Sequence, residues 1–124
     1  MAMQHLTDTE EIIMECVWTA TEEVTFAVII SAAKEKFNKE WKRQTVSTYL
    51  SHLVQKGYLD HCRRGKGMFY FPVISRDEYV RTITKGFLNF WYANRPQLLV
   101  ANLAENKALP EKDVEELRRL VKES

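Results

Sequence analysis

The segment from residue 44 to residue 57 has helical periodicity, and its two faces differ sharply in chemistry. At about 100° per residue, its apolar side chains gather on one side of a helix, and its short amides and hydroxyls gather on the other. The apolar side carries Val46, Tyr49, Leu50 and Leu53, and the polar side carries Gln44, Ser47, Thr48, Ser51 and Gln55. A helix face that meets only water is typically rich in Lys and Glu. This polar face instead favours a function in contacting the edges of DNA bases.

Two short apolar runs follow this helix and flank a basic, glycine-rich turn. Gly57 is placed to end the helix, because glycine readily adopts the positive φ of a C-terminal cap. In the hairpin, Phe69 and Phe71 are expected on one face and Met68 and Tyr70 on the other, with Gly65 and Gly67 supplying the turn. A helix followed by a basic hairpin is the layout of a winged helix.

Two further helices are predicted ahead of these elements. The segment from Thr7 to Glu10 is a capping box, which predicts a first helix over about residues 8–20. Thr25 can cap a second helix, whose apolar stripe ends before Asn38. The sequence therefore predicts a mostly α fold with a small β-hairpin, in which residues 1–74 form a winged helix-turn-helix DNA-binding domain.

Residues 75–124 are predicted to form about three helices with exposed apolar seams, a C-terminal helical dimerisation region. Ser75 and Glu78 form a second capping box, and Pro96 and Pro110 start the later helices. Because so short a region lacks a core of its own, we expect its seams to be buried in a homodimer. Packing against the winged helix of the same chain is the alternative. The residues assigned to dimerisation are Val80, Ile83, Phe87, Phe90, Trp91, Leu98, Leu99, Leu103, Val114, Leu117 and Val121.

The net charge of +1 hides an uneven distribution along the chain. Residues 1–33 contain six Asp or Glu and no Lys or Arg, whereas residues 34–66 contain nine Lys or Arg and three Asp or Glu. Positive charge is therefore concentrated around the predicted polar helix and hairpin, as a polyanion-binding surface requires. Chance unevenness is the alternative interpretation.

The second helix of a helix-turn-helix lies in the major groove, where its N-terminal residues reach base edges and neighbouring groups hold phosphates. Amides and hydroxyls suit base edges, basic residues at the helix start suit phosphate, and basic residues of the wing suit the backbone or the minor groove. Arg43 could also reach a guanine. A surface helix that happens to be polar is the alternative. The candidate DNA-binding residues are Lys42, Arg43, Gln44, Thr45, Ser47, Thr48, Ser51, Arg63, Arg64 and Lys66.

Other classes of protein are less consistent with the sequence. The chain has no apolar window of membrane-spanning length and no signal-peptide pattern, so we expect a cytoplasmic protein with no membrane partner. Cys16 and Cys62 lack metal-ligand spacing and are expected as free thiols, although the pair His61-Cys62 leaves a metal- or redox-sensing role open. We find no phosphate-cradling loop and no nucleophile motif, and we predict no enzyme, no cofactor and no metal site.

Four stretches, in their order and spacing, carry a resemblance to a known family. They are residues 6–18 (LTDTEEIIMECVW), 45–59 (TVSTYLSHLVQKGYL), 67–73 (GMFYFPV) and 109–120 (LPEKDVEELRRL). With them the chain resembles the penicillinase repressor family, the BlaI/MecI/CopY transcriptional repressors. The resemblance implies an N-terminal winged helix that binds a palindromic double-stranded DNA operator, a C-terminal region that makes a homodimer, and repression by blocking a promoter.

The resemblance also bears on induction. In the penicillinase branch, a sensor protease system leads to cleavage of an Asn-Phe bond in the dimerisation region, which corresponds here to Asn102 and Leu103, with Leu in place of Phe. The copper-sensing branch binds metal through C-terminal Cys-x-Cys motifs, and residues 75–124 contain no cysteine. The alternative to a repressor is a winged-helix module that binds proteins without sequence-specific DNA binding.

Overall fold

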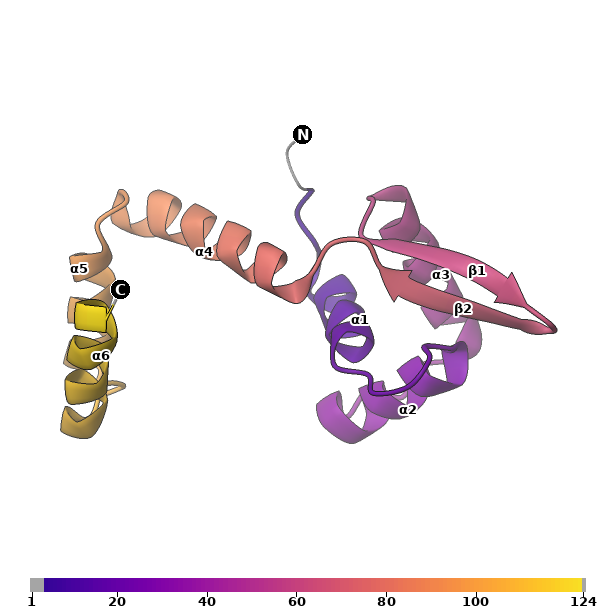
Figure 1. The fold of residues 1–124 in the computed structure, drawn as a ribbon, viewed down its shortest axis with the longest axis horizontal. Coiled ribbons are helices and arrows are strands. Elements are labelled where there is room, and N and C mark those ends of the chain that lie inside the picture. Colours follow the sequence, from indigo (N-terminus) through magenta and orange to yellow (C-terminus); the bar gives the residue numbers. More distant parts are fainter. Residues whose placement is uncertain (1–3, 124) are drawn as a thin grey trace. The chain divides into compact units, whose positions relative to one another are not determined.

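The computed structural model describes residues 4–123, and Figure 1 traces their helices and strands in chain order. The elements are α1 (Asp8–Trp18), α2 (Phe26–Phe37), α3 (Arg43–Gln55), β1 (Leu59–Arg64), β2 (Gly67–Pro72), α4 (Arg76–Tyr92), α5 (Pro96–Glu105) and α6 (Glu111–Glu123). They belong to two compact units, one ending at Tyr79 and one beginning at Val80. The predicted fold class, mostly α with a β-hairpin in a winged helix-turn-helix, is confirmed.

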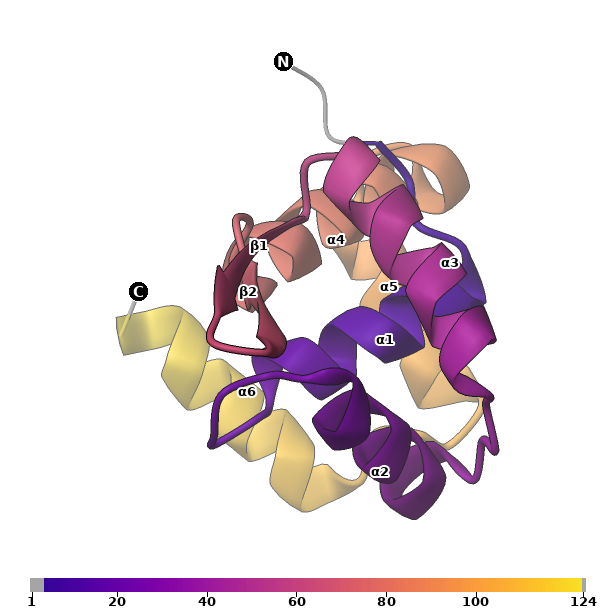
Figure 2. The same cartoon turned by 90° about the vertical axis from the view of Figure 1, so that its right-hand side faces the viewer.

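The core of the first unit is built mainly from the apolar faces of α1, α2 and α3. Helix α1 packs against both α2 and α3 (Figure 2). Full burial of a Leu or Ile side chain contributes about 1.5–3 kcal/mol, so these faces hold the three helices together. The buried apolar side chains of this core include Ile13, Met14, Val17, Ile29, Ala33, Val46, Leu50, Leu53, Tyr58 and Leu59.

Local signals set the helix ends. The capping box at α1 is complete, since the N–H of Thr7 donates to Glu10 Oε1 at 2.8 Å and the N–H of Glu10 donates to Thr7 Oγ1 at 3.2 Å. The first helix was predicted to end at about residue 20, and α1 ends two residues earlier, at Trp18, with Thr19 as its C-cap. Helix α3 ends before Gly57, whose φ of +83° is the predicted glycine cap.

The hairpin turn is one residue shorter than the turn predicted from Gly65 and Gly67. Arg64 pairs with Gly67, so Gly65 and Lys66 form a two-residue turn, and Gly67 begins β2 rather than supplying the turn. A φ of +60° at Gly65 fits the first position of a two-residue hairpin turn, whose twist matches that of the strands. The N–H of Tyr70 also donates to the carbonyl of Val24, at 3.0 Å, which attaches the hairpin to the connection between α1 and α2.

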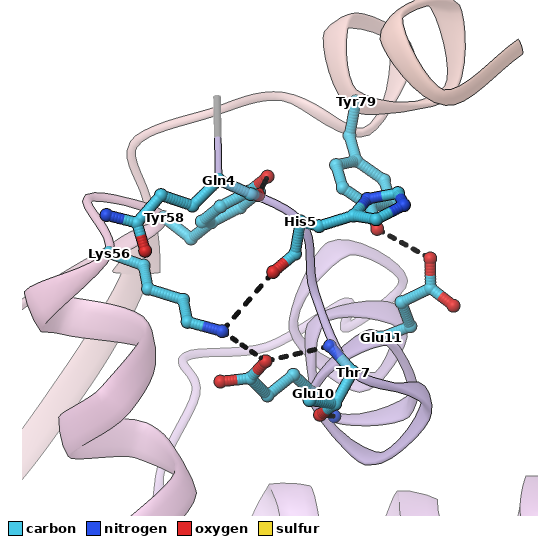
Figure 3. Close-up of polar contacts among 8 residues, drawn as sticks. All are labelled: Gln4, His5, Thr7, Glu10, Glu11, Lys56, Tyr58 and Tyr79. Atoms are coloured by element: carbon cyan, nitrogen blue, oxygen red, sulfur yellow. Dashed lines mark hydrogen bonds and ion pairs between the residues drawn. The ribbon is translucent and has the colours of Figure 1, made fainter. Parts of the chain in front are cut away.

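A buried ion pair joins the start of α1 to the end of α3 (Figure 3). Lys56 Nζ lies 2.7 Å from Glu10 Oε1 and also donates to the carbonyl of His5 at 3.3 Å. The Glu10 side chain is 2 % exposed and the Lys56 side chain 24 % exposed. Burial raises the pKa of Glu10, but the bonds from Lys56 and Thr7 outweigh burial, and the pKa lies below its ordinary value.

The second unit consists of helices whose apolar side chains are largely exposed. Among its described residues, Val80 to Glu123, no side chain is fully buried. Ala93 and Asn94 adopt positive φ and end α4, and Pro96 opens α5. The amide of Asn102 donates to the hydroxyl of Tyr92 at 2.8 Å. Within residues 4–123, no helix is long and apolar enough to cross a membrane.

Replacing Lys56 with Met should destabilise the fold, because the Glu10 carboxylate would stay buried without its partner cation. Removing one partner of a buried pair costs about 3–5 kcal/mol, and the partial exposure of Lys56 places the expected loss in free energy of unfolding near ~3 kcal/mol. Urea unfolding at neutral pH measures it. Lys34→Met is the matched control, since it breaks an exposed pair with Glu40 that is worth less than about 1 kcal/mol. Equal losses in both variants would contradict the structural role of the buried pair.

The lowered pKa of Glu10 also predicts how stability depends on pH. Because the folded pKa lies below the unfolded pKa, the carboxylate stabilises the fold above the unfolded pKa, and this contribution disappears as the pH falls through the folded pKa. Glu10→Gln should therefore lose less free energy of unfolding than the wild type between about pH 6 and pH 3. Urea unfolding across this range measures the difference. The control Glu22→Gln, at an exposed position, should retain the wild-type acid loss.

Candidate nucleic-acid interface

Helix α3 presents the polar face that the sequence predicts. Its apolar residues Val46, Leu50 and Leu53 are buried, which turns the opposite face outward. Gln44, Thr48 and Ser51 are exposed on that face, whereas Thr45 and Ser47 are half-buried. The Thr48 hydroxyl donates to the carbonyl of Gln44 at 3.1 Å, which leaves its lone pairs available to accept. The exposed face offers donors and acceptors at the spacing of successive helix turns.

The first residue of α3 is held by an aromatic platform. The guanidinium carbon of Arg43 lies 4.7 Å from the centre of the Phe26 ring, at the start of α2. The Phe26 ring in turn meets Tyr70 of β2 edge-on, with 5.8 Å between ring centres. A cation over an aromatic face is attracted by the ring quadrupole, so Phe26 restricts where Arg43 can reach.

Basic side chains of the wing share a groove with Arg43. This groove, of about 410 Å³, is lined by Arg43, Arg63 and Lys66 together with residues at the start of α2. The N-terminus of α2 adds a partial positive charge, because its first backbone N–H groups have no partner within the helix. Within residues 4–123, no carboxylate forms an ion pair with Lys42, Arg43, Arg63 or Lys66. The groove therefore combines three cations with a helix N-terminus and suits a phosphate.

Arg64 differs from its neighbour Arg63. Successive side chains of a strand point to opposite faces, and Arg64 lies on the far face with Cys62 and Phe69. There it forms an ion pair with Glu23 and stacks over the Phe69 ring at 4.7 Å. The structure thus brings Arg63 and Lys66 together with Arg43 but separates Arg64 from them.

Six residues that line this groove were not among the sequence candidates for DNA binding: Thr25, Phe26, Ala27, Gly67, Met68 and Tyr70. Thr25 was interpreted only as a helix cap, and Phe26 was not assigned to a DNA-binding surface. The signal that distinguishes Phe26 is its position one residue after the cap, where a helix begins and a side chain is least enclosed. A second, smaller groove of about 200 Å³ between α3 and the hairpin brings His61 near Ser51 and Gln55.

The candidates for dimerisation line the helices of the second unit. Phe90 is 75 % exposed and Trp91 is 65 % exposed, and their rings meet edge-on at 4.7 Å. An apolar groove of about 490 Å³ lies between α5 and α6. Of the other candidates, Val80, Phe87, Leu98, Leu117 and Val121 are exposed, and Ile83, Leu99, Leu103 and Val114 are half-buried.

The bond between Asn102 and Leu103 lies inside α5 rather than in a loop. The carbonyl of Asn102 accepts the N–H of Asn106 at 3.1 Å, and the side chain of Asn106 donates to Asn102 Oδ1 at 3.2 Å. The bond is therefore held in helical geometry by contacts on its C-terminal side.

Neither cysteine belongs to a cluster of metal-ligating side chains. Cys16 is buried in α1, and burial raises the pKa of its thiol, whereas Cys62 is exposed on β1. In the described part of the chain, no group of three or more His, Cys, Asp or Glu side chains is arranged to hold a metal ion.

Comparison with known proteins identifies relatives over nearly the whole chain. The family model described as "Penicillinase repressor" matches residues 6–123. The penicillinase repressor of Bacillus licheniformis is 29 % identical over 118 residues, which cover 95 % of this chain and 90 % of that protein. The methicillin resistance regulatory protein MecI of Staphylococcus aureus is 27 % identical over 86 residues, which cover 69 % of this chain and 70 % of that protein.

Two solved structures share the fold. The solution structure of the DNA-binding domain of the repressor BlaI is 24 % identical in sequence and matches with a TM-score of 0.52. The match covers 63 % of this chain and 92 % of the BlaI domain. A solution structure of monomeric Bacillus licheniformis BlaI in complex with the blaP half-operator matches with a TM-score of 0.51 at the same identity and the same shares of each chain.

Proposed function

This chain belongs to the penicillinase repressor family, and we propose that it is a transcriptional repressor that binds a palindromic DNA operator as a homodimer. One observation carries the proposal: the exposed amide and hydroxyl face of α3 lies in the same unit as a groove of unpaired cations. Base edges and phosphates are the two chemistries that these surfaces fit.

We assign α3 to the major groove. Gln44, Thr48 and Ser51 contact base edges, because a Gln can bond adenine through two hydrogen bonds and hydroxyls can donate or accept. Thr45 and Ser47 are half-buried at the edge of this face and are assigned a smaller part in DNA binding. A repressor of the same fold, monomeric BlaI of Bacillus licheniformis, was solved with a DNA half-operator, which supports this assignment.

Phosphates are assigned to the cations around α3. Lys42 and Arg43 hold the backbone beside the reading helix, and Arg63 and Lys66 of the wing hold an adjacent stretch. Arg64 is assigned to the wing's own stability through Glu23 rather than to DNA. Arg64 is therefore left out of the proposed DNA-binding residues, although it was among the candidates from the sequence.

The second unit is assigned to homodimerisation. Its exposed aromatic and aliphatic side chains are of the kind that mark interaction surfaces, and a second copy would cover the same seams on both chains. Two recognition helices would then meet half-sites about one helical turn apart, or a multiple of that distance. Linking two sites in this way raises affinity by roughly a hundred- to ten-thousandfold.

Proteolysis between Asn102 and Leu103 would abolish that gain by cutting the dimerisation region, with a sensor protease as the partner. Because the bond is helical, α5 must first open locally before a protease can reach it. We therefore propose cleavage as a route of induction that is governed by the local stability of α5.

The proposed activity is regulation of transcription, without a catalytic step. We place the protein in the cytoplasm, where the operator of such a repressor lies. A winged-helix module that binds proteins is the competing function, and it would show little of the salt dependence that phosphate contacts impose.

Neutralising the wing should change the salt dependence of DNA binding. Each lost phosphate contact should reduce the slope of log affinity against log salt by about 0.9, so the double variant Arg63→Gln/Lys66→Gln should flatten it by about two. Fluorescence anisotropy with a labelled duplex at several salt concentrations measures the slope. Arg64→Gln is the matched control and should leave the slope unchanged. A wild-type slope near zero would favour the protein-binding module instead.

Introducing charge into the apolar seam should dissociate the homodimer. Phe90→Glu places a carboxylate where the proposed interface excludes water, and the variant should sediment as a monomer at concentrations where the wild type is a dimer. Because Phe90 is exposed within one chain, the fold of the monomer should be retained. Lys85→Glu, an exposed charge change on the same helix, is the control. A monomeric wild type in analytical ultracentrifugation would contradict the proposal.

A further inference from the structure

The connection from the wing to α4 is short and anchored along its length. Only residues 73–75 separate β2 from α4. The N–H of Val73 donates to the carbonyl of Tyr58 at 2.8 Å, and the indole N–H of Trp18 donates to the carbonyl of Ile74 at 2.9 Å. Ser75 then accepts the N–H of Glu78 at 3.1 Å and caps the helix. The chain therefore enters α4 from a fixed position on the first unit.

The first turn of α4 is also fastened to α1 by an ion pair. Arg76 Nε lies 2.6 Å from Glu15 Oε1, and Arg76 Nη2 lies 3.4 Å from Glu15 Oε2. Two parallel contacts from one guanidinium restrict orientation as well as distance. The pair is partly exposed, so its contribution to stability is small and its geometric effect is the larger one.

Tyr79 provides a second, buried attachment (Figure 3). Its side chain is buried, and its hydroxyl donates to Glu11 Oε2 at 2.5 Å. The Tyr79 ring meets Tyr58 edge-on at 5.6 Å and lies 5.5 Å from the Trp18 ring. Burial and the bond to Glu11 both raise the pKa of Tyr79, so the hydroxyl stays protonated and remains a donor.

Helix α1 supports both attachments of α4 and also α3, the proposed recognition helix. Glu11 and Glu15 are one turn apart on α1 and therefore lie on the same face of that helix. Glu10, next to them, holds the end of α3 through Lys56. Helix α1 thus fixes the first turn of α4 and the recognition helix at neighbouring points.

We propose that Arg76 and Tyr79 are positioning residues that fix the direction in which α4 leaves the DNA-binding unit and thereby set the half-site spacing that the dimer accepts. This inference rests on the proposed function of a dimeric repressor. A loose tether lets two binding modules reach sites at many separations, whereas a rigid exit gives full affinity only at the matching separation. Neither residue needs to touch DNA for this effect.

The test compares full-length wild type with Tyr79→Phe/Arg76→Gln on a series of duplexes. Each duplex carries two inverted copies of the half-site selected from a random duplex pool, with the spacer varied one base pair at a time over a full helical turn. A single half-site duplex and the dimer dissociation constant are measured in parallel. Arg81→Gln, at an exposed position on α4 beyond this attachment, is the matched control.

We expect wild type and Arg81→Gln to lose roughly a hundredfold in affinity when the spacer changes by about half a helical turn. The double variant should lose less than about tenfold over the same change, with half-site affinity and dimerisation unchanged. If the double variant no longer folds, the single variant Arg76→Gln replaces it, because the ion pair of Arg76 is partly exposed and its loss should leave the fold intact. This variant should also lose less affinity than the wild type when the spacer changes.

The outcomes separate this inference from the proposed function. A variant that keeps the sharp wild-type spacing preference, or that loses affinity for the single half-site, would overturn the positioning role and leave the dimeric repressor intact. A wild type that binds the two-site duplexes no better than the half-site would contradict the dimeric repressor itself, and the positioning role with it.

Discussion

The buried contact between Glu10 and Lys56 is the constraint on which the DNA-binding unit depends. It joins the start of α1 to the end of α3, and it uses a carboxylate that also completes the capping box with Thr7. A single side chain therefore begins one helix and holds the recognition helix in place. Because the carboxylate is almost fully buried, separating it from Lys56 would cost free energy of folding. The pair therefore favours one relative position of α1 and α3.

This arrangement gives the uneven charge of the chain a structural meaning. Several acids of the N-terminal segment are used inside the first unit, where Glu10, Glu15 and Glu23 each pair with a basic side chain. Those pairs use Lys56, Arg76 and Arg64, while Lys42, Arg43, Arg63 and Lys66 form no ion pair within the described residues. The acidic segment thus holds the fold together, and the basic surface is left for a polyanion.

Much of the fold follows from local patterns. The spacing of apolar residues predicted α1, α2 and α3. The capping box predicted the start of α1, and Gly57 predicted the end of α3. The hairpin turn was predicted one residue too long, because both Gly65 and Gly67 can support a turn and only the pairing of Arg64 with Gly67 shows that Gly67 belongs to the strand. The alternation of side chains along β1 places Arg63 and Arg64 on opposite faces, and the sequence-based assignment of all wing cations to DNA did not apply this alternation.

Contacts between distant parts of the chain could not be predicted in this way. Nothing in the local pattern around Tyr58 or Tyr79 indicates that their rings meet, or that the Tyr79 hydroxyl donates to the carboxylate of Glu11, because such pairs depend on how the helices pack. The platform of Phe26 beneath Arg43 is of the same kind. The polar face of α3 could be identified because it lies on one helix, whereas the elements that pack against α3, namely α1, α2 and β1, come from other parts of the chain.

The central claim is that α3 reads the sequence of double-stranded DNA. Fluorescence anisotropy at physiological salt tests it most directly, by titrating the full-length protein against the duplex upstream of its own gene and against a scrambled duplex of the same composition. We expect the wild type to prefer the first duplex by about a thousandfold or more, and the variant Gln44→Ala/Ser51→Ala to show a much smaller preference. Equal affinity of the wild type for both duplexes would contradict this claim.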